Sequence, residues 1–402
     1  MRIQILSLYY EPEHTGNAPY ITGLARHLSE EHDVTVITGV PHYPEWVRDP
    51  EHRYWKRVEQ DRRLSTVRLR HYVPKVPDVP RRLPYELSWA SRAFVEAMRR
   101  PADLVIGGVP GLFTSHLAAR VGQLKKVPSG VIVQDIISRA ASATGMRGVS
   151  RAGRAIKAVE RSGLRAATGV ATIHERFADV LRDEYGLPPT SVTVIHNWSH
   201  IQAPVGDRES MRASLGWAPD EIVVLHSGNM GLKQNLINVI EAAKLVDASR
   251  LPIRFVLAGS GNQRAALETV GAGIHRLQIM DAVPEADFPS FLNAADALLV
   301  NEIPGVFEMS VPSKLTSYFA AGRPVIAATE SLSATAELVR ASGGGVTVSP
   351  GDPQALVDAA LSLRDDDVAS QRMSRAGQAF AQAELSSEAA LGAYKKWIES
   401  LV

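Results

Sequence analysis

Residues 307–328 read FEMSVPSKLTSYFAAGRPVIAA, and this stretch combines a loop, a short helix and a strand. After a loop-like beginning, an apolar periodicity runs from Ser313 to Ala321 and stops at Gly322. Ser313 is a favourable N-cap residue, and a glycine such as Gly322 commonly follows the end of a helix. The sequence therefore predicts a helix that starts from a loop and leads into the β-rich run 325–328.

Lys314 would lie in the first turn of this helix. A lysine there opposes the helix dipole, so it contributes little to helix stability alone. It becomes favourable if an anion binds, because the free backbone N–H groups of a helix N-terminus attract phosphate. An ordinary capped helix is the competing interpretation, and these residues alone leave both open.

Length and composition bound the class of protein. The 402 residues are enough for two domains of ordinary size, and 45% apolar with 22% charged residues is typical of a soluble globular protein. We find no run of about 18 apolar residues that would predict a membrane-spanning helix, and no signal-peptide pattern. Zero cysteines exclude disulfides and cysteine catalysis, and with the missing export signal they predict a cytoplasmic protein.

The charge is distributed unevenly although the net charge is only +1. Residues 1–200 hold 28 Lys and Arg against 20 Asp and Glu, whereas the remainder holds 16 against 23. A basic half joined to an acidic half suggests two domains with different partners. A membrane surface or an anionic substrate fits the basic half. Nucleic acid is disfavoured, because the sequence has no arginine-rich arm, zinc-ligand spacing or RNA-binding aromatic signature.

Strand-like and helix-like segments alternate along both halves. Strands are predicted at 2–8, 34–38, 103–107, 130–134, 169–173, 221–226, 253–258, 276–280 and 297–300. Helices are predicted at 18–29, 112–121, 151–166, 236–246, 263–270, 287–294, 368–383 and 388–402. Such alternation indicates parallel βαβ units buried on both faces. The predicted fold is α/β, with two doubly wound Rossmann-like domains facing each other across a cleft.

The predicted domains are 1–199 and 200–384, and residues 385–402 form a helix that returns toward the first domain. Ligands of such folds bind at the carboxyl ends of the strands. Between residues 41 and 82 the alternation breaks, and we expect an irregular, functional segment there. It contains His42, Tyr43 and Trp46, exposed aromatic side chains that either pack on a ligand or pin the loop.

Three glycine-containing loops follow predicted strands. Gly16 precedes the helix at 18–29, where backbone could approach a phosphate, although a dinucleotide GxGxxG is absent. Gly228 and Asn229 begin a loop that continues to Lys233, a reasonable pyrophosphate cradle that is not a Walker A motif. The loop of Gly259 and Ser260 could hold a base or ribose. Each loop could equally be a simple turn.

Several polar residues have competing interpretations. Asp135 follows a strand, so its carboxylate is a candidate for the site rather than for the core. His174, His196 and His226 also end strands, but no pair has metal-ligand spacing, and the aspartates at 365–367 read as a solvated helix end.

The segment 79–100 is amphipathic and rich in arginine. A packed helix is the default interpretation. Docking on a membrane, with Arg81 and Arg82 at the headgroups, is the alternative.

Together the motifs resemble the retaining family-4 glycosyltransferases of GT-B fold, especially the branch that makes colanic acid, O-antigen and related glycans. The resemblance covers nearly the whole chain. It rests on SLYYEPEHTG (7–16), VPHYPEW (40–46), QD (134–135), VIHNW (194–198), SGNMGLKQNL (227–236), AGSG (258–261) and VPSKLTSYFAAGRPVIA (311–327).

The resemblance implies a nucleotide-diphosphate sugar held mainly by the second domain, an acceptor held mainly by the first, and no metal or other cofactor. The implied donor-binding residues are Gly16, Gly228, Asn229, Lys233, Gly259, Ser260, Glu308, Ser313, Lys314 and Leu315. The implied acceptor-binding residues are His42, Tyr43, Trp46 and Asp135. Lys233, Lys314 and Asp135 are the implied catalytic residues; cationic side chains and backbone amides can stabilise a departing diphosphate without a metal.

The chain departs from the family pattern at three positions. Met309 and Ser317 stand where many relatives have two glutamates, so the ribose contact must differ, with Glu308 as a substitute. Gln134 stands where many relatives have histidine, which puts a histidine-assisted mechanism in doubt.

The leading hypothesis is retaining transfer from a nucleotide-diphosphate sugar, with UDP favoured, to an acceptor hydroxyl. The acceptor is either a polyprenyl-linked glycan, reached by peripheral membrane contact, or a small soluble metabolite. A nucleotide-sugar epimerase and a non-catalytic scaffold or sugar-nucleotide sensor are the competing hypotheses.

Overall fold

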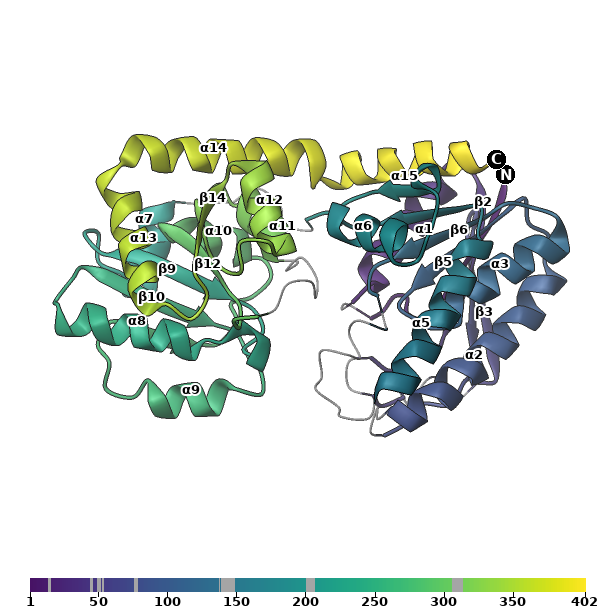
Figure 1. The fold of residues 1–402 in the computed structure, drawn as a ribbon, viewed down its shortest axis with the longest axis horizontal. Coiled ribbons are helices and arrows are strands. Elements are labelled where there is room, and N and C mark those ends of the chain that lie inside the picture. The colour runs from purple at the N-terminus through teal and green to yellow at the C-terminus, as the bar shows by residue number, and fades with distance from the viewer. Residues whose placement is uncertain are drawn as a thin grey trace. The chain divides into compact units, whose positions relative to one another are not determined.

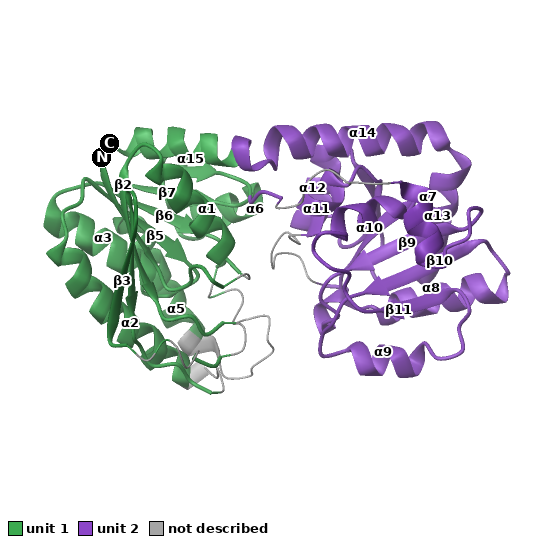
Figure 2. Cartoon of the chain, turned by 180° about the vertical axis from the view of Figure 1, so that it is seen from behind, with its two compact units in different colours: residues 1–196, 390–402 green, residues 197–389 purple. Residues whose placement is uncertain are grey.

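The computed structural model describes residues 1–13, 16–43, 46–48, 52, 54–75, 79–136, 138, 149–199, 207–305 and 314–402. The chain forms two compact units (Figures 1 and 2). Unit 1 contains residues 1–196 and 390–402, and unit 2 contains residues 197–389. Each unit has its own sheet, its own helices and its own core, so the predicted α/β fold with two Rossmann-like domains is confirmed.

In the described part of unit 1, eight strands form one sheet in the order β3-β4-β2-β1-β5-β6-β7-β8. The strands are β1 (Arg2–Ser7), β2 (Asp33–Gly39), β3 (Lys56–Asp61), β4 (Leu64–Leu69), β5 (Leu104–Val109), β6 (Ser129–Val133), β7 (Gly169–Thr172) and β8 (Val192–Val194). The helices are α1 (Ala18–Ser29), α2 (Val79–Arg99), α3 (Thr114–Lys125), α5 (Val149–Ala166), α6 (Glu175–Asp183) and α15 (Ser387–Leu401), with a 3₁₀ turn at Pro189–Ser191. All neighbouring strands are parallel except β3 and β4.

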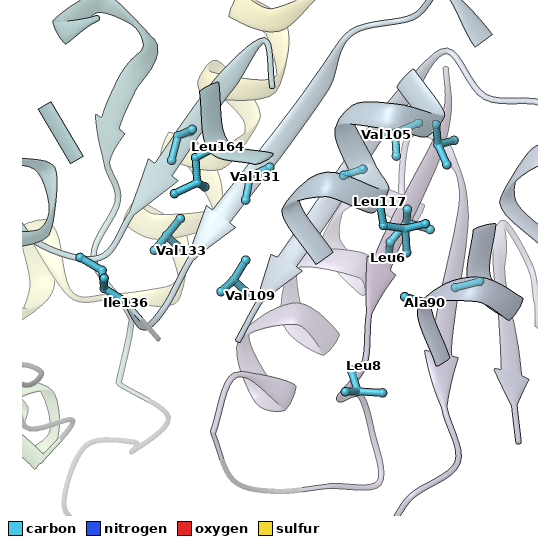
Figure 3. Packing of buried hydrophobic residues seen from close by; sticks show 14 of the residues in the cluster. Leu6, Leu8, Ala90, Val105, Val109, Leu117, Val131, Val133, Ile136 and Leu164 are labelled. Carbon is cyan, nitrogen blue, oxygen red and sulfur yellow. The ribbon is translucent and has the colours of Figure 1, made fainter. Parts of the chain in front are cut away.

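The central strands of unit 1 are mostly apolar because helices cover both faces of the sheet. Every residue of β5, LVIGGV, is buried. Figure 3 shows Leu6 of β1 and Val105 of β5 in one cluster of buried side chains with Leu117 of α3. Strands with two buried faces place most of their accessible polar groups at the strand ends.

The prediction of an irregular segment at 41–82 was wrong for part of that stretch. β3 and β4 form an antiparallel pair in which Lys56 faces Leu69 and Asp61 faces Leu64. β3 lies at the edge of the sheet and is mostly exposed, so its sequence KRVEQD needs no apolar alternation. This exposure is why the hydrophobic pattern gave no signal for β3. β4 is buried at every residue, but Ser65, Thr66 and Arg68 interrupt its apolar run.

In the described part of unit 2, six parallel strands form a sheet in the order β11-β10-β9-β12-β13-β14. The strands are β9 (Ile222–Ser227), β10 (Ile253–Ala258), β11 (Leu277–Met280), β12 (Ala297–Asn301), β13 (Val325–Ala328) and β14 (Gly345–Val348). The helices are α7 (Arg208–Ser214), α8 (Ile237–Ala248), α9 (Arg264–Val270), α10 (Phe288–Ala294), α11 (Lys314–Ala320), α12 (Ala334–Ser342), α13 (Pro353–Asp365) and α14 (Asp367–Glu384), with the 3₁₀ turn η3 at Leu232–Gln234.

The short helix predicted in the opening stretch is present as α11, and it ends as expected. Gly322 has φ +70°, and its N–H donates to the carbonyl of Phe319. A left-handed glycine after the last turn is the usual way to satisfy a terminal helix carbonyl. The elements α12, β14 and α13 were not predicted. With four partly exposed residues, β14 is too short to show the alternation of apolar and polar residues that marks a strand.

The terminal helix α15 packs against unit 1. Trp397 is 4% exposed, and a Cβ added to Gly130 of β6 would lie 2.6 Å from its ring. A Cβ added to Gly169 of β7 would lie 2.5 Å from Leu401. Lys395 Nζ lies 2.8 Å from the Glu31 carboxylate. The two glycines thus leave space on the sheet for the large side chains of the last helix.

None of the helices in these described segments is long and apolar enough to cross a membrane.

Replacing Trp397 by alanine should destabilise unit 1 by roughly 3–5 kcal/mol, because the surrounding strands cannot collapse into the space of an indole. Urea denaturation followed by circular dichroism measures the change. Glu399→Ala, on the exposed side of the same helix, is the matched control and should change stability by at most about 0.5 kcal/mol. Equal stability of the two variants would show that α15 is not part of the unit 1 core.

Candidate functional site

Two glycine loops lie side by side at the carboxyl ends of β9 and β10. The N–H of Gly228 donates to Ala258 O at 2.9 Å, and that of Met230 donates to Ser260 O at 2.7 Å. A Cβ added to Gly259 would lie 2.0 Å from Gly228 O, and both glycines have positive φ. No other residue fits this approach of two backbones. Gly228 and Ser260 remain exposed, so the loops offer backbone to a ligand.

Lys314, the first residue of α11, extends its side chain to the Gly228 loop. A Cβ added to Gly228 would lie 3.8 Å from both Cε and Nζ of Lys314. Nζ also lies 3.3 Å from Nε2 of His226, a fully buried residue on β9. Tyr318 fixes the helix to the same strand, because its hydroxyl accepts a hydrogen bond from the Ser227 N–H at 2.9 Å. The structure therefore brings together the predicted residues Lys314 and Gly228.

Burial sets the charges around Lys314. It lowers the pKa of the Lys314 ammonium to about 7, with Glu302 acting in the opposite direction. It also holds the pKa of His226 well below its usual range, so this imidazole is neutral and does not repel an anion. Glu302 accepts hydrogen bonds from Thr329 and Thr335, and burial raises its pKa. The lysine is thus a poorly solvated cation that an anionic ligand would stabilise.

Lys233 lies on η3, and its side chain is exposed. Asn301, at the end of β12, holds this loop in place. Its side-chain amide donates to Gln234 O at 2.9 Å and to Asn235 O at 3.0 Å. Ile303 N–H donates to Lys233 O at 2.9 Å. Asn301 is 1% exposed, so it positions the loop without reaching a ligand. This role was not predicted, although a polar residue at a strand end was the available signal.

The other predicted donor-binding residues of unit 2 are placed differently. Asn229 is exposed and lies between Gly231 and Gly261, within 3.0 Å of the position of a Cβ on either. The Leu315 side chain is fully buried in the core, so only its backbone is available to a donor. Ser317 is half-buried in α11. The remaining predicted positions in this region, Glu308, Met309 and Ser313, lie outside the described residues.

In unit 1, Glu13 joins the two predicted loops. Its Oε1 accepts hydrogen bonds from the N–H groups of His42 at 2.9 Å and Tyr43 at 3.0 Å. Burial raises the pKa of this carboxyl to about 7. Gly16 has φ +65°, and a Cβ there would lie 3.9 Å from the Tyr43 ring. Sequence analysis missed Glu13, although it lies within the quoted motif at 7–16.

The expectation that His42 is exposed was wrong. His42 is 3% exposed, with Nδ1 2.8 Å from Val40 O and Nε2 2.6 Å from the Tyr85 hydroxyl. Burial lowers its pKa to about 4, so the ring is neutral. Its two hydrogen bonds hold the loop in place. Tyr43 and Trp46 are half-buried, with ring centroids 6.1 Å apart. These two rings, unlike that of His42, are therefore partly accessible to a ligand.

Asp135 lies just beyond the carboxyl end of β6 and is half-buried. It lines a small pocket together with Ser115 and Glu160. The structure thus places it at the strand end, as the sequence predicts. Across the described residues, no group of three or more His, Asp or Glu side chains is arranged to hold a metal ion.

Replacing Lys314 by methionine should stabilise the protein at neutral pH. The folded pKa near 7 lies below the unfolded value of about 10.4, so the unfolded state binds more protons between these pH values. Wild-type stability from this group therefore rises with pH through that window. We expect Lys314→Met to raise the unfolding midpoint by about 2–8 °C at pH 7, which corresponds to ~1–2 kcal/mol, and by less at pH 9.5.

Differential scanning fluorimetry at the two pH values measures this difference. Lys244→Met, on the exposed side of α8, is the control and should show no pH-dependent gain. A loss of stability in Lys314→Met at pH 7 would contradict a desolvated ammonium.

Comparisons with known proteins identify the family of the chain. Residues 15–198 match the Glycosyl transferase 4-like domain model, and residues 221–366 match the model of Glycosyl transferases group 1. The chain is 30% identical over 372 residues to WcaI of Escherichia coli strain K12, a glycosyl transferase assigned to colanic acid biosynthesis, covering 89% of this chain and 90% of that one. It is 31% identical over 255 residues to the 2-deoxystreptamine glucosyltransferase of Streptomyces kanamyceticus, covering 60% and 64%.

Solved structures show the same fold at low identity. Sucrose-phosphate synthase of Thermosynechococcus elongatus superposes with a TM-score of 0.77 at 16% identity, covering 100% of this chain and 98% of that one. HepE of Anabaena, solved in complex with UDP, superposes with a TM-score of 0.72 at 15% identity, covering 100% of both chains. By its sequence motifs, its two α/β units and these matches, the chain belongs to the family-4 (group 1) glycosyltransferases of GT-B fold.

Proposed function

We propose that the protein transfers a sugar from a UDP-sugar to an acceptor hydroxyl with retention of anomeric configuration. The observation that carries the proposal is the half-buried Lys314, whose ammonium faces the exposed Gly228 loop beside a neutral imidazole. A diphosphate would supply the missing negative charge. The UDP bound in the structure of HepE supports the choice of nucleotide.

Charge stabilisation is the chemistry that these residues can provide. As the bond between sugar and diphosphate breaks, negative charge develops on the leaving phosphate. Lys314 and Lys233, with the backbone of the Gly228 loop, would stabilise that charge, and a site with little water strengthens the interaction. We propose that the leaving diphosphate takes the proton from an acceptor attacking on the same face. Two cations in this role make a metal unnecessary, so we propose metal-independent transfer.

Unit 1 would hold the acceptor. Tyr43 and Trp46 offer partly exposed rings on which a sugar can pack, and Asp135 offers a carboxylate at the end of β6. The names of the two relatives indicate different acceptor classes, a glycan and a small aminocyclitol. We propose a glycan on a polyprenyl carrier, because the match to WcaI extends over more of the chain.

Lys233→Ala should reduce turnover by about 10²–10³-fold, the loss that follows removal of one group stabilising developing charge. Release of UDP from UDP-sugars, measured in the presence of extracted bacterial lipid-linked acceptors, tests this. Lys244→Ala removes an exposed lysine of the same unit and should retain wild-type turnover. Transfer unchanged in Lys233→Ala would contradict the proposal, and rapid isomerisation of a UDP-sugar without acceptor would favour an epimerase.

A further inference from the structure

Helix α2 has one face in the core of unit 1 and one face in solvent. Tyr85, Trp89, Ala93 and Ala97 are at most 2% exposed and belong to the hydrophobic core. The helix runs along the outside of the unit (Figures 1 and 2). Burial of the inner face explains why the helix is stable in the fold. It does not explain the residues on the outer face.

The outer face carries large apolar side chains. Leu83, Leu87 and Val95 are 51%, 44% and 46% exposed. At 3.6 residues per turn, Leu87 and Val95 lie about 40° and 120° around the helix from Leu83, so the three side chains span about a third of its circumference, opposite the buried face. A row of exposed leucine and valine on a surface helix marks an interaction site more often than scattered single residues do.

The charges on this face are all positive. Arg81 and Arg99 are exposed beside Val95 on this face, and no exposed position over 81–99 is acidic. Arg82 is exposed too, but it lies on the side of the buried face, where it influences the pKa of Tyr9 and Glu86. Both glutamates of the helix instead serve the protein interior. Glu96 is 5% exposed and accepts hydrogen bonds from Lys56 and Arg100, and Glu86 accepts one from the Leu112 N–H at 2.6 Å.

Two aromatic residues extend the face on the arginine side. Trp55 is 69% exposed, and the Arg92 guanidinium lies 3.6 Å from the centre of its ring. Tyr72 is 45% exposed, and its N–H donates to Ser88 Oγ at 3.0 Å. Tryptophan and tyrosine are enriched at the boundary between lipid and water, where one end of the ring is apolar and the other is hydrated.

We infer that this outer face of α2, with Trp55 and Tyr72, docks unit 1 on an anionic lipid surface. Leucine and valine side chains enter the boundary between headgroups and acyl chains, while the arginines bind lipid phosphates. A uniformly negative lipid surface favours a face without exposed acidic residues, as residues 81–99 provide. A protein partner of mixed charge would not require such a face. That the lipid also brings a polyprenyl-linked acceptor rests on the proposed function; binding to the lipid does not.

Co-sedimentation with sucrose-loaded vesicles tests the inference. The full chain should pellet with vesicles of 70% phosphatidylcholine and 30% phosphatidylglycerol, and not with pure phosphatidylcholine. Salt should reduce binding because it screens surface charge. Arg81→Glu/Arg99→Glu should weaken binding at least about 25-fold, from about fivefold per basic residue near the surface. Leu83→Ser/Leu87→Ser should weaken it about tenfold or more, because the apolar contact is lost.

A double variant in unit 2 is the matched control. Leu245→Ser/Arg372→Glu replaces an exposed leucine and an exposed arginine on α8 and α14, and it should bind vesicles like the wild type. Failure of the wild type to bind the anionic vesicles, equal binding by the α2 variants, or an equal loss in the control would each overturn the inference. A UDP-induced thermal shift, measured in parallel without lipid, reports the proposed function separately and should be the same in all variants.

Discussion

Burial of the central strands on both faces directs the accessible polar chemistry to the ends of those strands. β5 and β9 are buried at every residue, so no functional side chain can project from their middle without unfavourable desolvation. At the carboxyl end of β9 the chain therefore turns polar at once, with His226 and Ser227 followed by the glycine loop. The candidate site in unit 2 follows from this constraint, since the exposed backbone of two strand ends is the surface left for a ligand.

Lys314 is unfavourable to the folded protein and useful to a bound anion for the same reason. A side chain taken from water loses hydration, which lowers the pKa of its ammonium to about 7. Neither the imidazole of His226 nor the hydroxyl-bound carboxylate of Glu302 restores that hydration fully. A phosphate group would do so, and its binding should draw a proton onto the lysine. Stability and ligand binding are thus opposed at this residue, as is common at functional sites.

The fold was largely predictable because its signals are local. Buried parallel strands read as short apolar runs, and Gly322 marks the end of α11 where the pattern placed it. The edge strand β3 was not predictable, since its charged residues face solvent and show no period. The short strand β14 was missed for a similar reason.

The roles of individual site residues depended on tertiary contacts. The sequence singled out Lys314 and the glycine loops, but not the partners that hold them, such as Asn301 and Tyr318. His42 is a further case: its motif suggested an exposed ring, whereas Val40 and Tyr85 fix it inside the unit. Residues that act through hydrogen bonds to distant elements have no signature in a single sequence.

Calorimetric titration of UDP in HEPES and in Tris at pH 8 tests the central role of Lys314 most directly. The free lysine is mostly neutral at this pH, and a bound diphosphate should recharge it, so binding should take up roughly 0.5–1 proton per UDP. In Lys314→Arg, which stays charged, UDP should bind without this uptake. A binding enthalpy that is independent of the buffer in the wild type, or equal proton uptake in Lys314→Arg, would contradict the assignment of Lys314 as the residue that receives the diphosphate.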